Sequence, residues 1–262
     1  TGLPVAIKIA REDKSARQEV EAYKRLNAAG CRGVPRLLHT RTDSGKTVMV
    51  LELLGLDLQS LIDKGGPLSI PSVVNVGIVM LYIPQSFHDA GLVHGDIKPG
   101  NVMLPHENGI CPLYLIDLGA AQSYMSPDGS HLPEQRCGPP LGSIDYTSVR
   151  TENEFRPCRR DDIESLGYVL VYLAKAILPW TDCDDEDVQV IKEYISPETL
   201  CKGLPHAIMN ILVHARALPF DGRPDYERLR SDLEKEKESP RSTAVLVSDD
   251  VVQSASNVTS RP

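Results

Sequence analysis

The spacing of apolar residues predicts strands mostly in the first half of this chain and helices mostly in the second. Short apolar runs bounded by turn residues predict strands at 5–9, 35–40, 47–53, 102–104 and 113–116. Apolar residues at helical spacing predict helices at 16–29, 58–63, 72–90, 163–178, 205–218 and 225–237. Pro84 lies deep inside one of these helices, and we expect it to kink or break that helix.

The composition narrows the class of protein. Its 262 residues, 41% of them hydrophobic, can form one large core or two lobes with a cleft between them. No apolar run approaches 18 residues and the start has no signal-like segment, so we expect an intracellular protein, cytoplasmic or nuclear, without a membrane partner. Six cysteines without a Cys-x-x-Cys pair argue against zinc and favour reduced thiols. A net charge of -8 argues against nucleic acid as a general partner.

One polar stretch has the residue types of a phosphoryl-transfer site. It runs from His94 to Asn101, and Asp117 follows after two predicted strands. Asp96 would orient an attacking hydroxyl and accept its proton, while Lys98 would neutralise charge on the moving phosphoryl group. Asn101 and Asp117 would hold magnesium ions that bridge nucleotide phosphates. The alternative, without a role in catalysis, is a turn rich in polar residues between two strands.

The strand predicted at 5–9 carries a single lysine, Lys8, in the pattern Val-Ala-Ile-Lys. A kinase lysine reaches the first two phosphates of the nucleotide from such a strand. The following helix offers Glu19 and Glu21, and either carboxylate would suit Lys8 as a partner. Alternatively, Lys8 lies along an edge strand with its ammonium in water, and the two glutamates form a solvated face.

The region 120–146 is rich in Ser, Pro and Gly, with the length of an active-site loop. Within it, Ser143 is placed to bond Asp96 from the substrate side. The densest basic cluster of the chain follows, at Arg156, Arg159 and Arg160. These side chains would suit an acidic or phosphorylated substrate. The other interpretation is that they tie the loop to neighbouring carboxylates such as Asp161 and Glu164.

Together these residues resemble the eukaryotic protein kinase fold and, within it, the casein kinase 1 family. The similarity extends from Val5 to about Leu233, and its most specific blocks stand in the family order at 51–55, 161–170, 178–180, 200–205 and 224–226. The resemblance implies a bilobal α+β fold with a small, partial β-sheet N-lobe and a mainly helical C-lobe. We place the N-lobe at 1–54, the C-lobe at 55–237 and a disordered Ser/Thr-rich tail at 238–262.

The resemblance also implies a serine/threonine protein kinase that uses ATP and Mg²⁺ on protein substrates of acidic character. It makes Lys8 the phosphate-binding lysine and Glu19 its helix partner. Leu51 would occupy the gatekeeper position, and the backbone of Glu52 and Leu54 would bond adenine. We expect a monomer.

Some positions depart from the family pattern. Gly95 replaces the arginine that recognises a phosphorylated activation loop in many kinases, so we do not expect control by that route. Asp162, by contrast, follows the family pattern, and the resemblance implies that it braces the catalytic loop from the central helix. Arg150 and Arg223 stand where many kinases have a glutamate–arginine pair, so the substrate loop must be anchored differently.

The printed sequence begins at the strand of Lys8, without the glycine-rich loop that covers the phosphates in the family. Each charge-assisted contact between the backbone of that loop and a phosphate is worth about 1.5–3 kcal/mol, so we expect weaker nucleotide binding without it. We interpret the chain as an N-terminally truncated fragment. One alternative is therefore an impaired fragment or pseudokinase that acts as a protein-binding module, although Lys8, Asp96, Asn101 and Asp117 are all retained. Another is a small-molecule phosphotransferase of the aminoglycoside kinase type, in which a histidine typically replaces Lys98.

Overall fold

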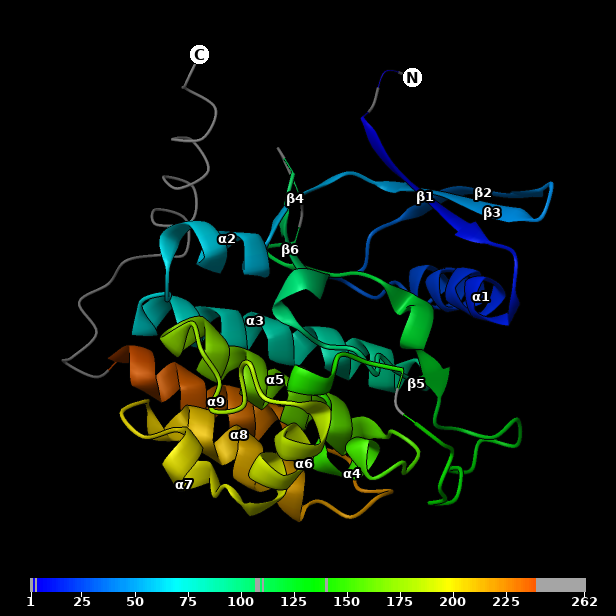
Figure 1. Ribbon diagram of the computed structural model, residues 1–262. Coiled ribbons are helices and arrows are strands. Elements are labelled where there is room, and N and C mark those ends of the chain that lie inside the picture. Colours follow the sequence, from blue (N-terminus) through cyan, green and yellow to red (C-terminus); the bar gives the residue numbers. More distant parts are fainter. Residues whose placement is uncertain (1, 3, 107–108, 110, 140, 239–262) are drawn as a thin grey trace.

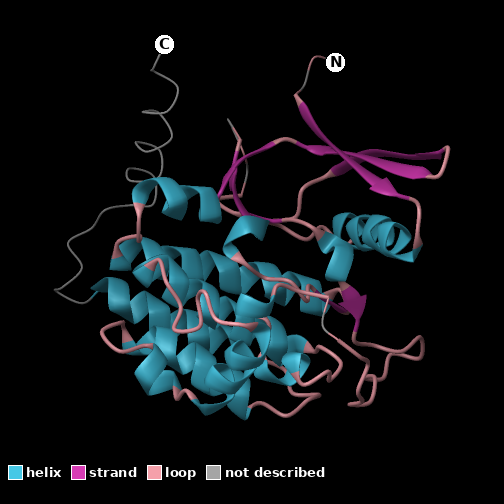
Figure 2. Cartoon of the chain, in the orientation of Figure 1, coloured by secondary structure: helices cyan, strands magenta, loops and turns pink. Residues whose placement is uncertain are grey.

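The computed structural model describes residues 2, 4–106, 109, 111–139 and 141–238. A small part built of strands and one helix lies against a larger part that is mostly helical (Figure 1). The strands gather almost entirely in and beside the small part, while helices fill the large part (Figure 2). The expected bilobal α+β fold is confirmed.

A three-stranded antiparallel sheet with the order β1-β3-β2 forms the small part. Its strands are β1 Val5–Arg11, β2 Leu37–Asp43 and β3 Lys46–Glu52. Helix α1, Lys14–Ala28, begins after Asp13, whose carboxylate caps the first turn, and contacts β2 and β3. Tyr23 and Leu26 on α1 are buried, so the helix holds a fixed position against the sheet.

Helix α3, Ile70–Asp89, lies at the centre of the large part and contacts α5 and α9. Helix α5 spans Arg159–Lys175 and α9 spans Tyr226–Glu238. Pro84 is buried inside α3, and the helix continues through it. The helix is therefore not broken at Pro84, where packing on several sides offsets one missing backbone hydrogen bond, and the expected kink stays a prediction.

The apolar character of α3 also bears on the expectation that no segment would suit a membrane. Among the described helices, α3 alone is long and apolar enough to cross one by length and composition, with a mean hydropathy of 1.4. In the folded protein, 61% of the apolar 18-residue stretch of this helix is buried. Central helices of globular folds commonly share this property because they are covered on most sides.

Two small sheets connect the parts and carry the polar loop. Strand β6, Val102–Pro105, pairs with β4, Leu54–Asp57, and with β7, Tyr114–Leu115, whereas β5, Leu92–Val93, pairs with β8, Gln122–Ser123. The β6–β7 pairing confirms the predicted hairpin. Because Asp117 follows β7 by two residues, the hairpin returns it to the side of the loop that ends at Asn101.

The remaining elements complete the large part. They are α2 Leu58–Gly65, α4 Val149–Glu152, α6 Asp185–Tyr194, α7 Pro197–Leu200, α8 His206–Ala217 and the 3₁₀ turns η1 Pro99–Asn101, η2 Leu118–Ala120 and η3 Ile144–Tyr146. Helix α5 begins earlier than expected, with Cys158 at its N-cap, and Asp161 accepts the Cys158 N–H at 2.7 Å from the first turn. Apart from Glu238, the expected tail lies outside the described residues, and the predicted lobe boundaries stay predictions.

Candidate active site

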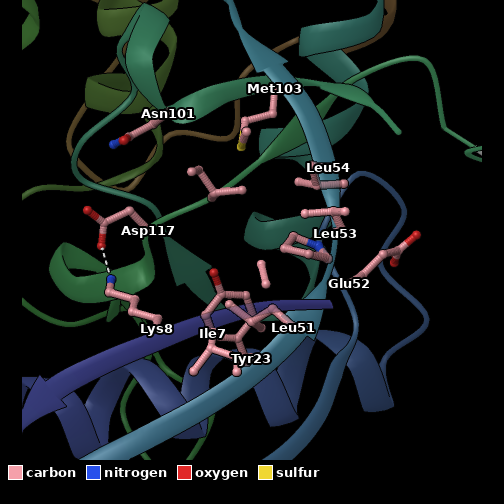
Figure 3. A pocket seen from close by; sticks show the side chains of 13 residues that line it. Ile7, Lys8, Tyr23, Leu51, Glu52, Leu53, Leu54, Asn101, Met103 and Asp117 are labelled. Atoms are coloured by element: carbon pink, nitrogen blue, oxygen red, sulfur yellow. Dashed lines mark hydrogen bonds and ion pairs between the residues drawn. The ribbon is translucent and has the colours of Figure 1, made fainter. Parts of the chain in front are cut away.

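A cavity of about 320 Å³ lies where the small sheet faces the large part (Figure 3). Its walls are mostly apolar and come from β1, α1, the β3–β4 segment, β6 and the residues after β7. Lys8, Asn101 and Asp117 lie at one end, and Glu52 and Leu54 lie at the other (Figure 3). Apolar walls with a few polar groups are typical of a small-molecule site.

Lys8 joins two carboxylates at the polar end of the cavity. Its Nζ lies 2.7 Å from Glu19 Oε1 and 2.8 Å from Asp117 Oδ1. Glu21, the other candidate partner, instead pairs with Lys24 on the surface of α1. Burial lowers the pKa of Lys8, but the hydrogen bonds to Asp117 and Glu19 outweigh it and raise the pKa above 10.5. The ammonium is therefore charged at neutral pH.

Asp117 is held in a strained backbone conformation, with φ 63° and ψ 78°. A non-glycine residue in this left-handed region costs about 1–3 kcal/mol, and such strain persists where the surroundings fix it. Burial raises the pKa of the Asp117 carboxyl, whereas Lys8 lowers it by more, so the pKa lies below 3.8. The cavity thus holds an ionised carboxylate in one orientation.

The catalytic-loop candidates converge on Asp96. Its Oδ2 accepts from Lys98 Nζ at 2.8 Å and from Asn101 Nδ2 at 3.0 Å. Its Oδ1 accepts the backbone N–H of Ser143 at 2.8 Å, and the Ser143 hydroxyl accepts from Lys98 at 2.6 Å. The predicted contact between Ser143 and Asp96 is confirmed, and it joins the long loop to the catalytic loop.

Asp162 braces the catalytic loop from helix α5, as expected. Its carboxylate accepts the backbone N–H of His94 at 2.8 Å and of Gly95 at 2.9 Å, and His88 Nε2 lies 2.9 Å away. Gly95 has φ +77°, and a Cβ there would lie 3.0 Å from the carbonyl oxygen of Ala120. A glycine therefore suits this position, where a larger residue would be strained.

The His94 ring is buried and fixed in one neutral tautomer. Its Nε2 lies 3.0 Å from the Ile116 carbonyl oxygen, which can only accept, so Nε2 carries the proton. Its Nδ1 accepts the Asp96 backbone N–H at 3.2 Å. Burial lowers the pKa of His94 below 6.5 despite nearby carboxylates.

Since the folded-state pKa of His94 lies below the unfolded value near 6.5, the unfolded state binds the proton first as the pH falls. We expect this group's contribution to stability to be complete above about pH 6.5 and to be lost as the pH falls towards the lower folded pKa. Ring-labelled histidine NMR should show the Nε2-protonated neutral form of His94 in the majority at pH 6.5. A His94 signal with a midpoint at or above 6.5 would contradict the assignment.

Asn101 and Asp117 fit a magnesium site completed by phosphates. The amide nitrogen of Asn101 is committed to Asp96, so its oxygen is the atom available to a metal. Asp117 supplies a carboxylate from the same cavity. Among the described residues, no cluster of three or more His, Cys, Asp or Glu side chains forms an all-protein metal site. Magnesium commonly takes one or two protein ligands plus substrate phosphates, and this pair matches that requirement.

A family model described as the protein kinase domain matches residues 1–244 of the chain. A casein kinase I homologue of Encephalitozoon cuniculi is 35% identical over 227 residues, which cover 83% of this chain and 70% of that protein. The chain belongs to the casein kinase I family. Casein kinase I homolog 1 of Schizosaccharomyces pombe is 31% identical over 84% of the chain, and casein kinase I homolog 3 of Saccharomyces cerevisiae is 29% identical over 87%. The aligned parts cover 51% and 49% of these two yeast proteins, about half of their length.

The site predicted for this casein kinase I family member is assembled in one place. Six of the predicted residues line the cavity directly, namely Lys8, Leu51, Glu52, Leu54, Asn101 and Asp117. Glu19 joins them through Lys8, and Asp96 and Lys98 join through Asn101 and Ser143. Their individual roles in catalysis and nucleotide binding stay predictions.

The arginine segment has internal partners in this casein kinase I fold. Arg160 bonds Glu134 at 3.0 Å and the Leu218 carbonyl at 2.8 Å, and Arg156 donates to the Pro133 carbonyl at 3.0 Å. Arg159 lies over the Tyr124 ring. These contacts favour the interpretation that the arginines bind the long loop to the rest of the chain, although the carboxylate involved is Glu134 rather than Asp161 or Glu164.

Sequence reasoning missed two sets of residues. His88 contacts Asp162 and also the Tyr226 hydroxyl of α9. Lys192 and Glu152 form a fully buried ion pair beside the long loop. Their sequence signal was at most a titratable residue beside an apolar one, as at His88 and Lys192, whereas Glu152 has polar neighbours; neither pattern identifies a distant partner.

Proposed function

We propose that this chain transfers the γ-phosphoryl group of ATP to serine or threonine hydroxyls of proteins. The observation that supports this best is that an ion pair and a hydrogen-bonded carboxylate meet at one cavity. Lys8 and Asp117 meet at 2.8 Å inside it, and Asp96 bonds the cavity residue Asn101 at 3.0 Å. Family membership supports the same reaction class.

Asp96 is the proposed acceptor of the substrate proton. As the hydroxyl oxygen bonds the γ-phosphorus, the bond from that phosphorus to the bridging oxygen of the departing diphosphate breaks, and the hydroxyl proton passes to Asp96. Lys98 lies 2.8 Å from Asp96 with a partly exposed side chain, so it can also offset charge on the transferred group. Magnesium, held by Asn101 and Asp117 when bound, would neutralise the phosphate oxygens.

The apolar end of the cavity is the proposed adenine site. Ile7 and Met103 lie on its walls, and Leu51 is a buried residue at its inner side. The segment of Glu52 and Leu54 crosses from β3 to β4 at the cavity edge, where backbone N–H and C=O groups can bond an adenine edge. Lys8 at the other end then meets the phosphates.

We further propose acidic protein substrates, a monomeric state and a cytoplasmic or nuclear location, without nucleic-acid or membrane partners. The acidic preference is supported by the family resemblance. The arginine segment adds little to it, because Arg156 and Arg160 already bond groups within the chain. A net charge of -8 supports the absence of nucleic acid.

The proposal is tested by titrating the full chain with ATP in a calorimeter, with and without Mg²⁺. Transfer of labelled γ-phosphate to casein and to a basic protein should then be measured in the same sample. Magnesium-dependent binding with transfer to casein is the expected result. Binding without transfer to any protein would favour a pseudokinase, and no binding at millimolar ATP would favour a docking module.

Replacement of Lys8 by Met should weaken productive nucleotide binding. The change removes one charge-assisted contact to the phosphates, worth about 1.5–3 kcal/mol, so kcat/KM for ATP should fall about 10- to 150-fold. It also leaves Glu19 without its partner at 2.7 Å. The matched control is Lys14→Met, which removes an exposed lysine from the start of α1. Equal effects of both variants would contradict the assigned role.

A further inference from the structure

Lys192 is an unusual residue of helix α6 because its side chain is completely buried. Its neighbours Val190 and Tyr194 on the same helix are 53% and 82% exposed. Lysine is almost never fully buried without a partner, since its charged group loses its hydration there. The position therefore requires an explanation in terms of what the ammonium contacts.

The Lys192 ammonium contacts three groups between residues 144 and 152, two of them in segment 143–147. It donates to the backbone carbonyl of Thr147 at 2.9 Å, to that of Ile144 and to the carboxylate of Glu152 in α4. The buried rings of Tyr168 and Trp180 lie 5.3 and 5.2 Å from its Nζ.

Trp180 adds a further contact to the same segment, because its Nε1–H donates to the Asp145 carbonyl at 2.9 Å. The carbonyl oxygens of Ile144, Asp145 and Thr147 are thus all held by two buried side chains. A loop with so many fixed carbonyls has little freedom to shift.

The start of this segment contacts the proposed catalytic centre. Ser143 donates its N–H to Asp96 and receives a hydrogen bond from Lys98. Just beyond the segment, Ser148 donates to buried Asp161 of α5 at 2.6 Å. Residues 143–147 therefore run from the catalytic carboxylate to the helical core, and the Lys192 contacts fix the middle of that path.

The pair that anchors this loop in many kinases is not formed here. Arg150 bonds Glu134 at 2.6 Å, and Arg223 bonds Asp89 at 2.8 Å. Arg150 and Arg223 have like charges, and each is paired with a separate carboxylate. The buried pair of Lys192 and Glu152 lies near the same loop and joins α4 to α6.

We propose that Lys192 and Glu152 are positioning residues that hold segment 143–147 as the support for the protein substrate. This inference rests on the proposed kinase function. Neither side chain lines the nucleotide cavity. Their loss should therefore impair binding and turnover of the protein substrate while binding of ATP is retained.

Four variants of the full chain test this proposal, namely Lys192→Met, Glu152→Gln, the double variant and the control Lys202→Met at an exposed lysine. Each single change leaves one buried group without its charged partner, so these variants are expected to unfold more easily. The double variant removes both charges and should recover most of the thermal stability. It still lacks the bonds to the carbonyls of Ile144 and Thr147.

The decisive readout is the KM for casein against the KM for ATP. In the double variant we expect kcat/KM for casein to fall at least tenfold, while the KM for ATP stays within twofold of the original. A purely structural role predicts that activity recovers together with stability. Recovery of both, or an equal rise of both KM values, would overturn the proposal.

Hydrogen exchange of the backbone amides at 143–148 separates this inference from the proposed function. Faster exchange there in the double variant, but not in Lys202→Met, is expected whether or not the chain transfers phosphate. If the unaltered chain is inactive but the exchange changes as expected, the kinase function fails and the positioning role stands. Unchanged exchange would overturn the positioning role even in an active enzyme.

Discussion

The Asp96→Asn variant is expected to lose phosphoryl transfer while it keeps its fold and its affinity for ATP. General base catalysis typically contributes about 10²–10⁴-fold, so kcat should fall by that factor. Asp96 does not line the nucleotide cavity, which explains why ATP binding should change little. The proton acceptor, rather than the binding site, is removed.

The fold should persist because asparagine has nearly the same shape as aspartate. Its amide oxygen can still accept from the Ser143 N–H, but its NH₂ group would then face donors on Lys98 and Asn101. We expect a loss of about 1 kcal/mol, equivalent to a decrease of about 2–4 °C in Tm for a domain of this size.

Single-turnover transfer to casein at saturating ATP, together with calorimetric ATP binding, measures both effects for Asp96→Asn. Glu227→Gln is a matched control, because Glu227 is an exposed carboxylate in the first turn of α9 and its change removes the same charge. Asp96 is not the base if Asp96→Asn retains more than about one tenth of the original turnover.

The residues of the site were predictable from the sequence because most of them lie in two short segments, 51–54 and 96–101. Asp96, Lys98 and Asn101 share one tight loop, and the apolar runs around Asp117 predicted the hairpin that returns it. Lys8 was more ambiguous, since its strand permits a surface position equally well. The residues alone left Glu19 and Glu21 open as its partner; the resemblance implied Glu19, and the structure shows that pairing.

The contacts that were missed join elements far apart in the sequence. Glu152 and Lys192 are 40 residues apart, and His88 and Tyr226 are 138 apart. No local period links such pairs, since each depends on how helices pack in the large part. Helix α6 was also missed; it is a short helix of ten residues, and its β-branched Val188, Val190 and Ile191 are as typical of a strand as of a helix.

Replacement of Asp162 by Ala should have the largest effect on stability of the changes considered. The carboxylate is buried and accepts from the backbone of His94 and Gly95 and from the His88 ring. Burial raises the pKa of Asp162, but the hydrogen bonds from His88 and from the Gly95 N–H lower it by more, so its pKa lies below 3.8. A buried anion with this many donors is a central fixed point of the loop.

Alanine in place of Asp162 leaves two backbone donors and a buried imidazole without an acceptor. Breaking a buried charged network in this way costs about 3–5 kcal/mol, which corresponds to a decrease of about 6–20 °C in Tm. The stability of Asp162→Asn should lie between those of the original protein and Asp162→Ala, because asparagine keeps one accepting oxygen.

Urea unfolding of Asp162→Ala and Asp162→Asn, followed by tryptophan fluorescence, gives the free energies, and Trp180 is the single tryptophan reporter. Asp187→Ala, an exposed aspartate on α6, is the control for a lost carboxylate. Transfer to casein should be measured well below the Tm of Asp162→Ala, where the protein is folded. There a reduced kcat would show that Asp162 also orients the loop that carries Asp96, because His94 and Gly95 directly precede it. A stability loss below about 1 kcal/mol would instead mean that water replaces the carboxylate at this position, and the brace would not be needed.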